Sequence, residues 1–332
     1  MVRVGVIGLG AIGREHLDIY RNIPGVEVTA VADFVRHVAD DVAAEIGCAA
    51  FSSATELLEA GVVDAVTLST PDHLHHDDAV KIMQADVHLL LEKPIATSVE
   101  ESDNLVRVAE ESNVIAMPGH TLRFANQYIT AKNLVSSGSI GSVIHGNVRC
   151  NNKVGVARRV NGRTSVTFFL GIHDIDALTW IAGERVVAVQ AFESEQRTPD
   201  GGQAVAVTGN LRLAGGGVVA LEAAWGLPEE YPTDIDARLR LIGNSGEVRI
   251  DVHDFGMSSY SSRLTYPVPA GGSVYGAPQG MLYEELNAFL RAVRGEIEIP
   301  VTMREAADAV RVATTIDKAI ISGNTEQVVY AS

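Results

Sequence analysis

The chain has 332 residues, of which 46% are hydrophobic and 20% are charged. This is the composition of a folded globular protein, and at about 150 residues per domain the length predicts two domains. The 42 acidic residues outnumber the 26 basic ones, and the resulting net charge of −16 excludes the basic footprint of a nucleic-acid-binding protein. We therefore expect neither nucleic acid nor an anionic membrane surface among the partners.

Cysteine usage and hydropathy point to a cytoplasmic protein. Cys48 and Cys150 are the two cysteines of the sequence, which is too few for a disulfide framework or a zinc cluster and is typical of a reducing compartment. No apolar run approaches the roughly 18 residues that a membrane span needs. The apolar stretch at residues 1–13 leads into charged residues rather than into the small residues of a signal-peptide cleavage site.

The first third of the chain alternates short β-branched runs with helical stretches. The runs predict strands at Val2–Ile7, Val26–Ala32, Asp64–Ser69, Val87–Leu91 and Val114–Met117. Helices are predicted between them, at Ala11–Tyr20, Ala54–Ala60, Asp77–Gln84 and Val99–Glu111. Strands that alternate with helices form parallel sheets, so this part of the chain is expected to be an α/β domain.

From about residue 143 the pattern changes to extended runs joined by glycine-rich turns, which is typical of an antiparallel sheet. The strands are predicted at Val186–Glu193, Val205–Leu213, Val218–Ala224, Ala237–Ile242 and Glu247–Val252. Helical spacing returns at Leu282–Arg294 and Arg304–Ser322. Between them, residues 254–279 are rich in Gly, Ser, Pro and Tyr and are predicted to be a long loop.

The glycine pattern that follows the first predicted strand is a dinucleotide-binding fingerprint. Gly8-Leu9-Gly10-Ala11-Ile12-Gly13 reads G-x-G-x-x-G and opens the first helix. The three glycines permit the tight turn, the close approach of a pyrophosphate and the packing of helix on strand. The helix N-terminus supplies the anion site. We expect the cofactor-binding residues here to be Gly8, Gly10, Ala11, Ile12 and Gly13.

Asp33 predicts the preferred cofactor. It lies 20 positions after Gly13, just beyond the second strand, where an acidic side chain binds the ribose diol of NAD. Its negative charge repels a 2′-phosphate, so NAD is favoured over NADP, although Arg36 and His37 leave NADP use open. The alternative is an ordinary glycine turn in which Asp33 only caps a helix.

A second candidate motif follows the predicted strand at 87–91. Glu92-Lys93-Pro94 stands at the carboxyl edge of the sheet, where ligands collect in this class of fold. A lysine at that edge would face the cofactor. Taken alone, adjacent Glu and Lys residues are more often a solvated surface pair.

Together these motifs resemble the Gfo/Idh/MocA family of NAD(P)-dependent sugar and polyol dehydrogenases. Besides the glycine loop and Glu92-Lys93-Pro94, the resemblance rests on segments at residues 70–75, 119–124, 138–143, 171–176 and 241–246, and it spans nearly the whole chain. It implies an α/β Rossmann dinucleotide-binding domain and an α+β C-terminal domain with a large open antiparallel sheet. The exposed face of that sheet commonly mediates homodimers or homotetramers in the family.

The resemblance also implies domain boundaries and residue roles. Residues 1–122 would bind NAD, and residues 123–332 would bind substrate and mediate oligomerisation, with C-terminal helices packing back on the first domain. Lys93 and His173 match the family's proton-handling residues, and Arg123 falls where substrate is often contacted. The further positions that match the cofactor site are Thr70, Pro71, His75, Glu92 and Lys93.

One departure from the family pattern affects the acid–base machinery. Many polyol dehydrogenases of the family carry Asp four residues before the histidine, whereas this chain carries Phe169. Asp176 lies one helical turn after His173 and could orient its imidazole as a third catalytic residue. The alternative is that Asp176 only braces a helix. In either case, inositol specificity does not transfer from the resemblance.

Two further clusters have competing interpretations. Arg158, Arg159 and Arg163 could grip a phosphate or carboxylate of an anionic sugar, with Arg163 as a substrate residue, or could form salt bridges across a subunit interface. His73, His75 and His76 resemble a metal cluster, but no convergent Cys or Asp ligands accompany them, so no metal is expected.

The sequence therefore predicts an NAD-dependent dehydrogenase acting on a secondary alcohol of a sugar, cyclitol or sugar derivative. Two alternatives stay open at this point. One is an NAD-dependent glycosidase of the same fold, which works through transient oxidation and elimination. The other is a regulator that binds NAD without catalysis.

Overall fold

The computed structural model describes residues 1–160, 162–199, 201–252 and 272–331. The chain divides into two compact units. Unit 1 comprises residues 1–121 and 271–307, and unit 2 comprises residues 122–270 and 308–332. The first break lies beside the predicted boundary at residue 122, whereas residues 271–307 join the first unit rather than the second.

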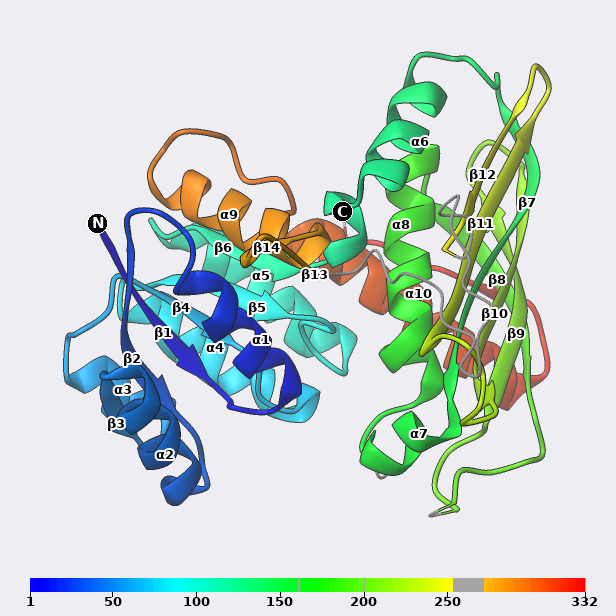
Figure 1. Cartoon of the computed structure of the whole chain (residues 1–332). Helices are drawn as coiled ribbons and strands as arrows, with labels where there is room; N and C mark the ends of the chain where they lie inside the picture. Colours follow the sequence, from blue (N-terminus) through cyan, green and yellow to red (C-terminus); the bar gives the residue numbers. More distant parts are fainter. Residues whose placement is uncertain (161, 200, 253–271, 332) are drawn as a thin grey trace. The chain divides into compact units, whose positions relative to one another are not determined.

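Unit 1 is built on a six-stranded parallel sheet, as the alternating pattern predicts (Figure 1). Its strands are β1 (Val2–Ile7), β2 (Val26–Ala32), β3 (Ala49–Phe51), β4 (Ala65–Leu68), β5 (His88–Glu92) and β6 (Ala116–Gly119). They lie in the order β3-β2-β1-β4-β5-β6. The order reverses direction between β1 and β4, and in such sheets ligands bind at the carboxyl ends of the strands beside this point.

Helices flank this sheet. They are α1 (Ala11–Tyr20), α2 (Arg36–Ile46), α3 (Ala54–Glu59), α4 (His75–Gln84), α5 (Val99–Glu111) and α9 (Met281–Val293). α1 packs beside α9, and α4 packs between α3 and α5. Ser53 and Ser98 cap the N-termini of α3 and α5 through their hydroxyl oxygens, which is a favoured role for serine. Three segments begin at the carboxyl edge of the sheet: the glycine loop after β1, the loop after β4 that contains Thr70, and Glu92–Pro94 at the end of β5.

Unit 2 contains a seven-stranded sheet in the order β12-β11-β7-β10-β9-β8-β15. The strands are β7 (Val143–Lys153), β8 (Val186–Glu193), β9 (Ala206–Leu213), β10 (Val218–Leu227), β11 (Ile235–Gly243), β12 (Glu247–Asp251) and β15 (Glu326–Gln327). The predicted hairpins β9–β10 and β11–β12 are confirmed. The sheet is not wholly antiparallel as expected, because β7 and β10 run parallel. Parallel neighbours need a long crossover, and three helical elements, Val154–Val160, Thr167–Gly171 and Ile172–Ala182, lie within it.

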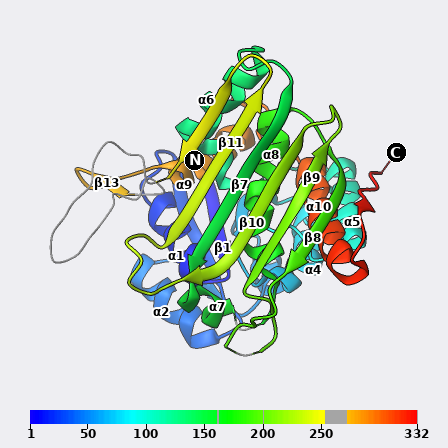
Figure 2. The same ribbon diagram turned by 90° about the vertical axis from the view of Figure 1, so that its right-hand side faces the viewer.

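Helices cover one face of this second sheet. α6 (Asn126–Ser136) packs against α8 (Ile172–Ala182), and α8 packs on β7, while a one-turn π-helix at Thr167–Gly171 lies on β10. The short α7 (Val154–Val160) follows β7, and α10 (Met303–Ser322) is the last helix of the chain. Figure 2 shows the other face of the sheet, in front of which no helix of the described residues lies.

The predicted loop at 254–279 lies largely outside the described residues, and its end forms a two-stranded hairpin of β13 (Gly272–Val274) and β14 (Ala277–Gln279).

Across the described ranges, the helices are too short or too polar for any of them to traverse a lipid bilayer.

Candidate functional site

The glycine loop after β1 has the geometry that a pyrophosphate cradle requires. Gly8 adopts φ of 90°, and a Cβ there would lie 2.7 Å from the backbone of Ser69 and Thr70. A Cβ on Gly13 would lie 2.0 Å from the carbonyl oxygen of Gly8, so helix and loop pack together only without a side chain. A Cβ on Gly10 would meet no atom within 4 Å, which leaves its backbone open to a ligand at the N-terminus of α1.

Asp33, at the end of β2, holds the glycine loop in place. Its Oδ2 accepts a hydrogen bond from Leu9 N at 2.8 Å, and its Oδ1 accepts one from Val35 N at 2.8 Å. Each carboxylate oxygen has a second lone pair, so both remain able to accept a ribose hydroxyl. The next residue, Phe34, leaves 94% of its surface exposed. The helix-cap alternative does not account for the bond to Leu9.

The loop after β4 is tied to the glycine loop. The Ser69 hydroxyl lies 2.8 Å from the carbonyl oxygen of Gly8 and donates to it. The next residue, Thr70, is half-buried, and its Oγ1 has no hydrogen-bond partner among the described residues. A buried hydroxyl without a partner costs free energy unless a ligand or water satisfies it. Thr70 therefore fits the predicted cofactor site.

His75 lies at the start of α4 and has only 1% of its surface exposed. Its Nδ1 is 2.8 Å from the carbonyl oxygen of Pro94, and its Nε2 is 2.8 Å from the carbonyl oxygen of Thr70. The ring thus joins the loop after β4 to the segment after β5. The predicted contact of His75 with a cofactor stays a prediction, and both ring nitrogens already face protein atoms.

Glu92, at the end of β5, points into the core of unit 1. Its Oε1 lies 3.3 Å from Nε2 of His16, which is fully buried on α1. Burial raises the pKa of Glu92, but His16, Lys93 and His75 together outweigh burial and leave it below its usual value. Glu92 is therefore a buried carboxylate, and it is the residue before Lys93 in the chain. Lys93 itself is half-buried and precedes a cis peptide bond to Pro94.

Three residues at this edge of the sheet are missing from the sequence predictions. They are His16, which faces Glu92, Ser69, which holds the glycine loop, and Phe34, which is exposed beside Asp33. For His16 the available signal is its place three residues after Gly13, on the face of α1 that turns to the sheet. For Ser69 and Phe34 the signal is adjacency to residues already predicted.

In unit 2 the structure brings Arg123 together with Asp176. Arg123 Nε and Nη2 donate to the two oxygens of Asp176 at 2.9 and 2.6 Å, and the two side chains are 4% and 1% exposed. The guanidinium also lies 5.5 Å from the centre of the Trp180 ring. This buried fork accounts for both residues structurally. The substrate contact of Arg123 and the orienting of His173 by Asp176 stay predictions.

His173 follows the π-helix, on the first turn of α8. It is half-buried, and so is Phe169 four residues earlier, while most neighbours in this segment are buried. The Phe169 ring packs against Trp225 of β10, with 5.9 Å between the ring centres and 54° between the ring planes. Trp225 is 1% exposed. Phe169 is thus held by the core of unit 2. Lys93 belongs to unit 1 and His173 to unit 2.

The arginine cluster lies on and just after α7. Arg158 and Arg159 are exposed. Arg163 donates from Nε to the carbonyl oxygen of Val160 at 2.8 Å and from Nη2 to that of Arg159 at 3.1 Å. Arg163 therefore satisfies the last carbonyls of this helix, a role that cationic side chains favour. Its predicted contact with substrate stays a prediction.

The three neighbouring histidines do not converge on a point. His73 lies beside Asp72, His75 bridges two carbonyl oxygens, and His76 contacts Asp77 and Asn104. Within the described ranges, no group of three or more His, Cys, Asp or Glu side chains is arranged to hold a metal ion.

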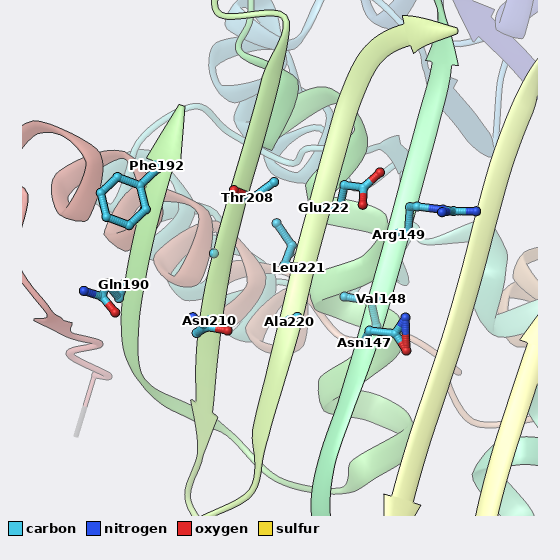
Figure 3. A pocket seen from close by; sticks show the side chains of 11 residues that line it. Asn147, Val148, Arg149, Gln190, Phe192, Thr208, Asn210, Ala220, Leu221 and Glu222 are labelled. Carbon is cyan, nitrogen blue, oxygen red and sulfur yellow. The ribbon is translucent and has the colours of Figure 1, made fainter. Parts of the chain in front are cut away.

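A shallow pocket of about 330 Å³ lies on the helix-free face of the sheet in unit 2 (Figure 3). Side chains from β7, β8, β9 and β10 line it, among them Asn147, Arg149, Phe192, Asn210 and Glu222. Phe192 is 65% exposed. The pocket lies on the open face of the sheet, which the family resemblance implies to mediate oligomers.

Two family models match the chain. One, described as an oxidoreductase family with an NAD-binding Rossmann fold, matches residues 2–120. The other, described as the GFO/IDH/MocA C-terminal domain, matches residues 128–249. Together they span most of both units, and the first includes the glycine loop, Asp33 and Lys93.

Curated relatives carry several different activities. An uncharacterized oxidoreductase of Streptococcus pneumoniae is 30% identical over 55% of this chain and 51% of its own length. The scyllo-inositol 2-dehydrogenase (NAD(+)) of Bacillus subtilis is 30% identical over 57% of this chain and 56% of its own. The 2,7-anhydro-N-acetylneuraminate hydratase of Escherichia coli is 25% identical over 76% of this chain and 68% of its own. The chain thus spans about half the length of the first two.

Solved structures share the fold over the whole chain. The scyllo-inositol dehydrogenase of Lactobacillus casei with bound NAD(H) and scyllo-inositol superposes with a TM-score of 0.85, at 20% identity and 99% coverage of each chain. The WlbA dehydrogenase of Bordetella pertussis, in complex with NADH and UDP-GlcNAcA, gives a TM-score of 0.83, also at 20% identity and 99% coverage of each.

Proposed function

Because this chain belongs to the Gfo/Idh/MocA family of oxidoreductases, we propose that it is an NAD-dependent dehydrogenase acting on a secondary alcohol of a sugar, cyclitol or sugar derivative. The observation that carries this proposal is the assembled cofactor edge of unit 1. There Gly10, Asp33 and Lys93 follow the ends of three strands at the carboxyl edge of the same sheet. The backbone at Gly10 is open to a ligand, and the carboxylate of Asp33 binds the glycine loop. When bound, the nicotinamide supplies the hydride acceptor or donor.

The side chains of this protein handle the proton. Lys93 is the residue that hydrogen-bonds the reacting hydroxyl and assists its loss of a proton, and His173 is its acid–base partner. Glu92 precedes Lys93 in the chain, and the charge of Lys93 is one of the influences that hold the pKa of this buried carboxyl below its usual value. General acid–base groups of this kind contribute about 10²- to 10⁴-fold in rate.

The cofactor preference follows from Asp33. Its two oxygens suit the diol of an unphosphorylated ribose, and the same charge opposes a 2′-phosphate. NAD is therefore the proposed cofactor, and NADP would bind more weakly.

The proposal is tested by incubating the purified protein with NAD and a panel of sugars, cyclitols and nucleotide sugars while NADH absorbance is recorded. Lys93→Met should lower kcat by about 10²-fold or more while the Kd for NAD stays the same. Lys81→Met is the matched control, because Lys81 is a half-exposed lysine paired with Asp78 on α4. Near-normal kcat in Lys93→Met contradicts the assignment.

A second candidate function is the NAD-dependent glycosidase predicted as the alternative, in which oxidation is transient and the cofactor is regenerated. The Escherichia coli relative that aligns with 76% of this chain is named a hydratase and not a dehydrogenase, which supports keeping a reaction other than net oxidation as the second candidate. Product formation by NMR without net NADH would favour it over the dehydrogenase. NAD binding without any turnover across the panel would favour a non-catalytic regulator instead.

We further propose that the helix-free sheet face of unit 2 pairs with a second copy of the chain in a homodimer or homotetramer. Phe192 and Val218 are exposed on this face at 65% and 40%, beside polar side chains such as Asn210. Exposed apolar side chains grouped with polar ones are typical of subunit interfaces. Light scattering should give a multiple of the chain mass, and Ala220→Arg, at the centre of the face, should yield monomers.

A further inference from the structure

The imidazole of His75 makes two hydrogen-bond contacts that a neutral ring cannot both satisfy. Each ring nitrogen lies 2.8 Å from a backbone carbonyl oxygen, Nδ1 from that of Pro94 and Nε2 from that of Thr70. A carbonyl oxygen only accepts hydrogen bonds. Neutral imidazole has one N–H donor and one lone pair, whereas the imidazolium has two donors. Both contacts are therefore hydrogen bonds only when the ring carries a positive charge.

Two acidic groups act on this ring through their charge. Glu92, at the end of β5, and Asp72, in the turn before α4, both favour the charged imidazolium. Burial is the largest influence and holds the pKa of His75 below its usual value, and the two carbonyl oxygens and the two carboxylates offset this only in part. The positive charge thus depends on the two hydrogen bonds that it makes possible, so protonation and the spacing of the two loops are linked.

The two carbonyls belong to segments that both bear on the proposed reaction. Thr70 lies in the loop after β4, next to Ser69. The Ser69 hydroxyl donates a hydrogen bond to the carbonyl oxygen of Gly8, so this loop lies beside the glycine loop. Pro94 follows Lys93 directly in the chain. A rigid ring that bonds both carbonyls sets the distance between the cofactor loop and the backbone that carries Lys93.

We propose that His75 is a positioning residue for Lys93, acting as an imidazolium that bridges the Thr70 and Pro94 carbonyls and so fixes the lysine relative to the cofactor. The inference rests on the proposed function for its kinetic consequence, but the charge state itself is a property of unit 1. When the ring loses its proton, one bridge becomes a contact between two lone pairs and breaks. The reaction should then slow, because small misplacements of reacting groups reduce rates by up to about 10²-fold.

The charge state is tested on the full-length protein labelled with ¹⁵N-histidine, with and without NAD, by long-range ¹H–¹⁵N NMR over a pH series. The His75 signals are assigned by their loss in His75→Gln. We expect both ring nitrogens to show the protonated imidazolium resonance in the pH range where the enzyme turns over. A single protonated and a single unprotonated nitrogen throughout that range would overturn the proposal, whatever the enzyme's substrate.

The positioning role is tested by kinetics. Glutamine keeps one side-chain nitrogen and cannot bridge two separate carbonyls as the ring does, so His75→Gln should lower kcat about tenfold or more with little change in KM for NAD. The parent should also lose kcat as the pH rises through the His75 titration seen by NMR, and His75→Gln should lack this alkaline limb. His76→Gln on the same helix is the control and should behave as the parent.

The outcomes separate the two proposals. If the parent oxidises no member of the substrate panel, the proposed function fails, while the NMR result still decides the charge of His75. If the parent is active and a folded His75→Gln keeps its kcat and its pH profile, the positioning role is wrong and the proposed function stands.

Discussion

Arg123 and Asp176 form a two-pronged ion pair inside unit 2, with donor–acceptor distances of 2.9 and 2.6 Å and almost no exposure of either side chain. Arg123 comes from the turn before α6, and Asp176 comes from α8. The pair therefore ties the start of the unit to the helix that carries His173. Removing one partner of such a pair leaves the other charged and buried.

The first prediction concerns this pair. Arg123→Met and Asp176→Leu should each lower the free energy of unfolding by about 3–5 kcal/mol, because each leaves a buried charge without its partner. The double variant should recover much of that loss. Urea unfolding of the three variants and the parent provides the double-mutant cycle. Additive losses would mean that the two charges are not coupled.

The second prediction concerns cofactor choice. Asp33→Ser combined with Phe34→Arg should weaken NAD and strengthen NADP, because a repulsive carboxylate is replaced and a cation is introduced. The ratio of kcat/KM for the two cofactors should shift by about 10²-fold toward NADP. Asp33→Asn is the comparison that removes the charge: its amide oxygen can keep the hydrogen bond from Leu9 N, while the bond from Val35 N is lost. A parent that already prefers NADP would contradict the role of Asp33.

The third prediction concerns the ring of Phe34, which is 94% exposed and follows Asp33, the proposed ribose-binding residue. We expect this ring to stack on the adenine of the cofactor. Base–aromatic stacking is worth about 1–3 kcal/mol, so Phe34→Ala should raise the Kd for NADH about tenfold. The Kd for the reduced mononucleotide, which lacks adenine, should not change. An equal rise in Kd for NADH and for the mononucleotide would mean that the substitution disturbs the loop around Phe34 and does not remove a stacking contact.

The fourth prediction concerns Arg163. If its guanidinium contacts an anionic substrate, Arg163→Ala raises KM for that substrate about tenfold while NAD affinity stays the same, and added salt weakens binding in the parent. Arg107→Ala, at an exposed arginine that pairs with Glu111 on α5 of unit 1, serves as the control. The contrary result is a lower melting temperature with unchanged KM. It would leave Arg163 with its helix-terminal bonds to Val160 and Arg159 alone.

The fifth prediction concerns the pH dependence of stability. Burial, together with the charge of Glu193, raises the pKa of Asp317 on α10 from 3.8 to about 6, against a smaller opposing effect of Thr167. A carboxyl whose pKa is higher in the folded state favours folding at low pH, and this contribution disappears as the pH rises from about 4 through about 6. Asp317→Asn should therefore gain about 3 kcal/mol over the parent at pH 8 and much less at pH 4. A gain that is equal at both pH values would exclude titration of Asp317 as the cause.

The sequence by itself determined the parallel sheet of unit 1 and the place of the glycine loop and Asp33 at its carboxyl edge. Alternating strands and helices have strong local periodicity, and the constraints on Gly8 and Gly13 are local backbone constraints that motif spacing reports directly. Asp33 is found for the same reason, since its distance from the loop is set by one β–α–β unit. The hairpins of unit 2 could also be predicted from their glycine turns.

Tertiary structure alone decided what the polar side chains contact. The partners of Arg123, Glu92 and His75 are Asp176, His16 and two carbonyl oxygens, and no sequence period encodes pairings between separate elements. The parallel alignment of β7 and β10 depends likewise on a crossover whose path the strand pattern does not specify. Buried polar groups take the partners that the packed core offers them, because water is no longer available to satisfy them.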